Sequence, residues 1–117
     1  MRIFLLFMAC AGVAQAHAFL DHAEPRVGET LPGSPAAVSI WFTEDVNPAG
    51  TKIAVFDAKG TEVDAKNSTL DAANHGHMSV SLPKLAPGVY KVVWDATCPR
   101  GHHTSGHFTF AVKSEGN

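Results

Sequence analysis

The chain has 117 residues, is 45% hydrophobic and carries a formal net charge of −2 at pH 7. This length allows one domain with a single modest core. Lysine and arginine are few and scattered, which excludes the basic patch of a nucleic-acid-binding protein.

The first sixteen residues have the pattern of a secretory signal peptide. Arg2 precedes a mostly apolar stretch over 3–13, and the small-x-small sequence 14–16 stands directly before His17. The apolar stretch is shorter than the about 20 residues that a transmembrane helix needs. We therefore expect a signal peptide over 1–16, export to the periplasm, and a mature domain over 17–117 without a membrane span.

Cleavage after Ala16 would make His17 the first residue of the mature chain. Its free α-amino group and its ring Nδ1 could then close a chelate ring on a metal ion. This pair of donors would form only after export.

Alternating apolar and polar residues predict short strands in the mature domain. In chain order they lie over 38–42, 53–55, 78–82, 89–94 and 108–112, with turns over 57–60 and 85–88. The polar segment 63–77 is expected to be a long loop. Six or seven short strands in one domain favour an all-β fold, an antiparallel β-sandwich.

Several stretches resemble the CopC copper-resistance family of periplasmic copper-binding proteins. They are the mature start 17–28, residues 31–35, the strand 38–43, the run 87–94, Gly101-His102 and the closing 106–110. The resemblance implies an immunoglobulin-like β-sandwich of about seven strands. It also implies a Cu(II)-binding protein for copper buffering, delivery or resistance, and not an enzyme.

The resemblance also implies a ligand set, the histidine brace. His17 matches the ligand that binds through its amine and its ring, and His102 matches the histidine of an Asp-x-His motif. The aspartate position falls on Arg100, whose guanidinium stays protonated and cannot act as an ordinary ligand. Three nitrogens from two histidines suit Cu(II), which takes tetragonal N/O sites.

The vacancy at position 100 leaves a further ligand open. His103 is one candidate, but it needs a turned loop over 101–103, because adjacent side chains on an extended strand point apart. Asp95, Glu44 and Cys98 are others, and water is the remaining possibility. We include His103 with His17 and His102 in the expected metal site.

The other histidines and the cysteines have simpler interpretations. A second, softer copper site at His75, His77 and Met78 is less favoured than a solvated loop in which Met78 begins a core strand. Cys10 would leave with the signal peptide, so Cys98 would have no disulfide partner and is expected to pack as a small apolar residue. Surface or rim positions are expected for His22 and His107, and core or rim positions for Trp41 and Trp94.

Two other classes of function remain open. A histidine brace also occurs in lytic polysaccharide monooxygenases, although the mature domain leaves little room for their flat substrate surface. The chain could instead be a module that docks on a copper transporter or a copper enzyme.

Overall fold

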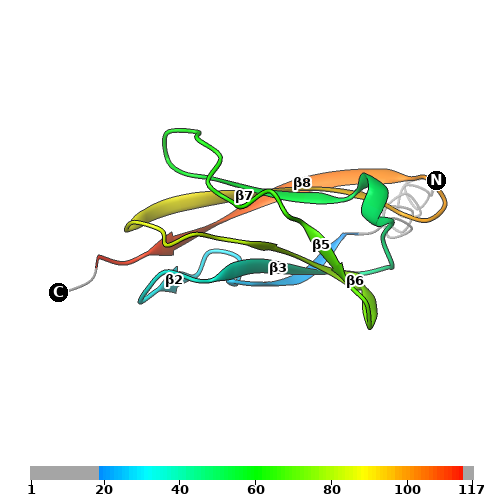
Figure 1. The fold of residues 1–117 in the computed structure, drawn as a ribbon, viewed down its shortest axis with the longest axis horizontal. Helices are drawn as coiled ribbons and strands as arrows, with labels where there is room; N and C mark the ends of the chain where they lie inside the picture. The colour runs from blue at the N-terminus through cyan, green and yellow to red at the C-terminus, as the bar shows by residue number, and fades with distance from the viewer. Residues whose placement is uncertain (1–18, 115–117) are drawn as a thin grey trace, which may run out of the picture.

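The computed structural model describes residues 19–114 and shows two sheets packed face to face (Figure 1). The predicted signal peptide and His17 lie outside the described residues. One four-stranded sheet has the order β1 (Leu20–Glu24), β3 (Ala37–Phe42), β6 (Asn74–Ser81) and β5 (Thr69–Asp71). The other has the order β2 (Thr30–Leu31), β8 (His103–Val112), β7 (Gly88–Thr97) and β4 (Lys52–Phe56). A short 3-10 helix, η3 (Pro48–Gly50), precedes β4.

The core lies between the sheets and follows the predicted alternation. In β3, residues Val38, Ile40 and Phe42 are buried, while the residues between them are half-buried. Val92 and Trp94 of β7 enter the same core from the opposite sheet. This two-residue period confirms the predicted β-sandwich. Within residues 19–114, no helix is long and apolar enough to cross a membrane.

Three short strands were not predicted. They are β1, β2 and β5, and β2 is unusual in pairing parallel with β8. The predicted loop over 63–77 is wrong for Thr69–Asp71 and for the first four residues of β6. The inward position at the start of β6 is Gly76, where a Cβ would lie 3.3 Å from the Glu44 carbonyl oxygen. Because a glycine occupies that position, the apolar alternation is not visible in the sequence.

The polar segment after β4 covers the edge of the second sheet. The Asp64 carboxylate accepts a hydrogen bond from the Val55 amide at 2.8 Å, and the Ser68 hydroxyl accepts one from the Ile53 amide at 3.0 Å. The Val63 amide donates to the Val55 carbonyl at 2.8 Å. These bonds satisfy backbone groups that an edge strand would otherwise leave open to pairing with another chain.

Candidate metal site

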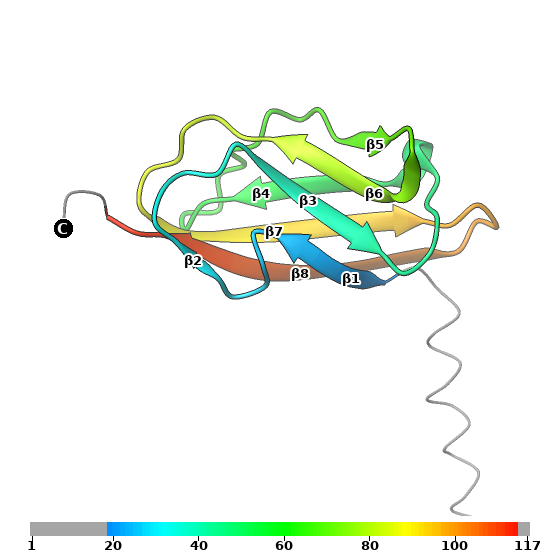
Figure 2. The same ribbon diagram turned by 90° about the horizontal axis from the view of Figure 1, so that it is seen from below.

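The elements around His102 meet at one end of the sandwich. Figure 2 shows the start of β1, the end of β3 and the turn between β7 and β8 at that end. The segment 43–47 follows β3 and is bonded on both sides. The Val46 amide donates to the His75 carbonyl at 3.0 Å, and the Asn47 amide donates to the Thr97 carbonyl at 2.7 Å. This segment is thereby fixed beside the β7–β8 turn.

A tight turn places His102. The Cys98 amide donates to the His102 carbonyl, and the Gly101 amide donates to the Cys98 carbonyl, both at 2.8 Å. Gly101 has a φ of 91°, a left-handed conformation that favours glycine. The backbone therefore fixes the position of His102 just before β8 begins.

His102 lines a hollow of about 370 Å³ at this end of the molecule. Besides His102, the wall contains two carboxylates, a guanidinium, a thiol and a proline. These belong to Glu44, Asp45, Arg100, Cys98 and Pro99. Arg100 thus stands in the hollow together with Glu44 and Asp45, which follow β3. No feature of the sequence pointed to Asp45, since it lies more than fifty residues before the motif. Within residues 19–114, no cluster of three or more His, Cys, Asp or Glu side chains is close enough to hold a metal ion.

The first described residue, Phe19, is hydrogen-bonded to the residue that precedes the wall of this hollow. The Phe19 amide donates to the Thr43 hydroxyl at 3.0 Å, and the Thr43 amide donates to the Phe19 carbonyl at 2.8 Å. Thr43 directly precedes Glu44. The chain that enters β1 therefore begins beside the hollow that His102 lines.

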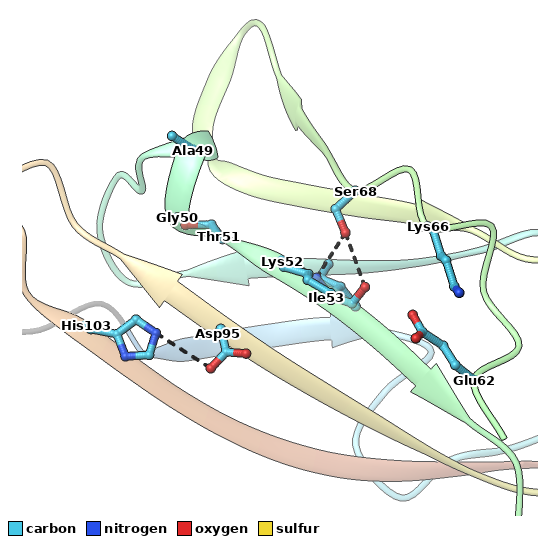
Figure 3. Close-up of a pocket in the computed structure, with 10 residues that line it drawn as sticks. All are labelled: Ala49, Gly50, Thr51, Lys52, Ile53, Glu62, Lys66, Ser68, Asp95 and His103. Atoms are coloured by element: carbon cyan, nitrogen blue, oxygen red, sulfur yellow. Dashed lines mark hydrogen bonds and ion pairs between the residues drawn. The ribbon is translucent and has the colours of Figure 1, made fainter. Parts of the chain in front are cut away.

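His103 lies in a different hollow from His102. It is the first residue of β8, and its Nε2 is 3.6 Å from Oδ1 of Asp95 on β7 (Figure 3). Both side chains line a larger hollow of about 750 Å³ beside η3 and β4. The structure therefore does not show the turned loop that would bring the His102 and His103 rings together. Their side chains diverge as expected where a chain becomes an extended strand. That His103 is a copper ligand stays a prediction.

Cys98 is 4% exposed and belongs to the apolar core, although it also reaches the hollow of His102. This burial agrees with the packing role expected for it. His107 is exposed on β8, as expected for a residue that faces away from the core.

Trp41 lies on the outer face of the first sheet, between two histidines. His22 of β1 and His77 of β6 are its register partners on the two neighbouring strands. The Trp41 ring centroid is 4.5 Å from that of His22 and 4.2 Å from that of His77, with interplanar angles of 7° and 5°. Three flat rings thus form one stack, which we call the His-Trp-His stack (His22, Trp41 and His77).

The alternation of side chains along β6 separates Met78 from His77 in the alternative copper site. Met78 is 1% exposed and points into the core, whereas His77 stacks on the outer face of the same strand. Adjacent residues of a strand face opposite sides of the sheet. His75, His77 and Met78 therefore do not come together. Met78 is a core residue as expected, but it lies inside β6 and does not begin it.

The Asp71 carboxylate holds the His77 ring, with Oδ2 at 3.0 Å from Nδ1. The hydrogen bond from the Ala73 amide, and then the bond from His77, lower the pKa of Asp71 below its ordinary value of 3.8. A carboxyl group whose pKa is lower in the folded state stabilises the fold above its unfolded pKa. This stabilisation is lost as the pH falls through the folded pKa.

We therefore expect Asp71→Asn to lower the free energy of unfolding at pH 6, and to lower it much less at pH 2.5. The wild-type carboxyl becomes protonated as the pH falls toward and through its lowered folded pKa, so the substitution then removes less charge. Urea unfolding of both proteins at the two pH values checks this. An equal difference at both would mean that the Asp71 charge does not stabilise the fold.

Comparisons with known proteins agree on one family. Residues 20–113 match the CopC domain. The copper transport protein CutJ of Bacillus subtilis is 33% identical over 97% of this chain, which spans only 21% of CutJ. Protein YobA of Escherichia coli K12 is 32% identical over 84% of this chain and 80% of its own length. The crystal structure of CopC from Methylosinus trichosporium OB3b superposes with a TM-score of 0.81 at 29% identity, covering 86% of this chain and 98% of that one. The chain therefore belongs to the CopC domain family.

Proposed function

We propose that the exported and processed protein binds one Cu(II) ion at the His102 end of the sandwich, for copper buffering, delivery or resistance in the periplasm. The pairing of Phe19 with Thr43 beside the His102 hollow carries this proposal. His17 precedes Phe19 by two residues, and one extended residue spans about 3.5 Å. The amine and the ring of a processed His17 are therefore within reach of that hollow.

The donors proposed for Cu(II) are the His17 amine, the His17 ring and the His102 ring. Nitrogen and oxygen donors in a tetragonal arrangement suit Cu(II). Glu44 and Asp45 line the same hollow and bring negative charge toward the cation. Water or a carboxylate from this wall fits the remaining position better than His103, because the His103 ring would first have to leave Asp95.

The copper would be passed to a copper transporter or a copper enzyme. This part of the proposal is supported by the match to a segment of CutJ, whose name is copper transport protein.

Replacing His102 tests the site. In processed protein that begins at His17, we expect His102→Ala to weaken Cu(II) binding by about 100-fold or more, because one of three nitrogen donors is lost and even groups behind a ligand contribute about 10- to 100-fold. His107→Ala is the matched control, since His107 is an exposed histidine of β8 that lines no part of the His102 hollow. Competition with a chromophoric chelator measures both. Equal affinities for the two variants would place the copper site elsewhere.

Arg100 is expected to weaken the site by its charge. Arg100→Ala should tighten Cu(II) binding several-fold, since a unit charge a few ångströms away in a partly solvated site contributes about 1 kcal/mol or more. Arg100→Asp should tighten it further, because it adds a carboxylate to the wall. If both variants bind Cu(II) no more tightly than the wild type, the Arg100 guanidinium does not oppose the bound cation.

A further inference from the structure

Strand β1 contributes only Ala23 and the half-buried Leu20 to the hydrophobic core. It is an edge strand, its pairing with β3 is interrupted by a register shift between Leu20 and His22, and Ala23 is its one buried residue. On the outer face, β1 is held by the stacking of His22 on Trp41. Pairing with β3 and the packing of Phe19, Leu20 and Ala23 hold the inner side of this segment, and on the outer face the contact between two rings adds to them.

On the β6 side of the stack, the His77 ring that supports Trp41 is held by a hydrogen bond. Trp41 rests on His77, and Asp71 is a carboxylate that accepts only, so Nδ1 of His77 is the atom that donates the 3.0 Å hydrogen bond. The Nε2 atom of His77 is buried and has no hydrogen-bond partner within residues 19–114. The His77 ring is thus oriented by one carboxylate and otherwise serves as a flat surface for Trp41.

On the β1 side of the stack, a carboxylate likewise lies beside the Nδ1 atom of the histidine. The Asp21 carboxylate lies 2.8 Å from Nδ1 of His22, and the two side chains are 60% and 57% exposed. The ring of His22 is thereby oriented parallel to Trp41, although both residues of the pair are largely in solvent. An exposed ion pair contributes little to overall stability, so a role in global folding does not account for this arrangement.

We propose that the His-Trp-His stack is a positioning element for copper binding: it clamps β1 onto β3 and β6 and so holds His17 beside His102. This inference rests on the proposed function. His22 follows His17 by five residues, and Phe19 between them is the residue that pairs with Thr43 at the hollow. Fixing β1 at His22 limits the conformations that the leading residues can take before copper binds.

The stack acts on affinity because pre-organised ligands lose less conformational entropy on binding. Ordering a few more residues on binding reduces affinity by about tenfold, given typical costs for each immobilised group. Removing the His22 ring should therefore weaken Cu(II) binding without removing a donor.

The experiment compares His22→Ala with His22→Phe in processed protein that begins at His17. Phenylalanine keeps a flat ring to stack on Trp41 but has no nitrogen donor. We expect about tenfold weaker Cu(II) binding for His22→Ala and binding within about twofold of wild type for His22→Phe. Amide hydrogen exchange in β1 should accelerate in the alanine variant alone. His107→Ala is the matched histidine control and should change neither measurement.

Each outcome decides between the possible roles of His22. Wild-type affinity for His22→Ala would overturn the positioning role. If His102→Ala still loses affinity in the same series, the proposed copper site stands and only the positioning role of the stack is wrong. If His102→Ala also keeps wild-type affinity, the proposed function itself fails. Equal losses for His22→Ala and His22→Phe would show that the nitrogen atoms of His22, and not its stacking, support copper binding, which also overturns the inference.

Discussion

A processed protein extended by one alanine before His17 is expected to bind Cu(II) about 100-fold more weakly or worse, on the scale of losing one donor from a small ligand set. The extension converts the α-amine of His17 into a peptide amide, whose nitrogen is a poor metal donor while it keeps its hydrogen. The chelate ring between amine and imidazole is then lost, although every side chain of the described site remains. Competition titration against a chelator measures the change.

The control for this experiment is an alanine added after Asn117, at the other terminus of the chain. It changes the length and mass of the protein by the same amount and should leave Cu(II) affinity unaltered. If the N-terminal extension also leaves the affinity unaltered, the amine of His17 is not a ligand. The proposed site would then have to be rebuilt from side chains alone.

Replacing Gly106 by alanine is expected to lower the free energy of unfolding by about 1–3 kcal/mol, the usual cost of overpacking a filled core. Gly106 of β8 pairs with Trp94 of β7, and a Cβ at this position would lie 2.7 Å from Cζ2 and 2.9 Å from Cε2 of the indole. Trp94 cannot easily move away, because it is 5% exposed and packs edge-on against Phe42 at 5.4 Å between ring centroids. Chemical denaturation measures the loss.

Two further variants isolate the cause of that loss. Gly33→Ala is the control glycine, since a Cβ there would meet nothing within 4 Å. It should leave the free energy of unfolding nearly unchanged. In a Trp94→Phe background, where the ring is smaller, Gly106→Ala should be less costly than in the wild type. An equal cost in both backgrounds would show that the Gly106 effect does not come from the indole.

The strands that the sequence predicts correctly are those in which every second residue is apolar. β3 and β7 are long enough, and buried enough on one side, to show this period. β1 has one buried residue in five, and β2 has two residues, so neither contains a repeat that could be recognised. β5 is held by pairing with β6 and by no pattern of its own. Such strands are defined by their partners, which a single sequence does not show.

The candidate site was predictable only in part for a similar reason. The position of His102 followed from the family resemblance, and the structure places it at a hollow. The separation of His103 from His102 depends on where β8 begins, which is at His103, the last residue of the turned loop over 101–103. The stacking of Trp41 between His22 and His77 depends on the register of three strands that are far apart in sequence. Alternation along one strand indicates which face each residue takes, but it does not identify the residue that lies opposite on the neighbouring strand.

The most direct test of the proposed copper site is pulsed electron paramagnetic resonance of processed protein loaded with one equivalent of Cu(II). Wild type and His102→Ala are compared, because nitrogen couplings identify the donors themselves. We predict one Cu(II) per chain, with couplings from two imidazoles and one amine in the wild type, and with one imidazole coupling missing in His102→Ala. Identical nitrogen couplings in the two proteins would contradict the proposal that His17 and His102 bind copper together.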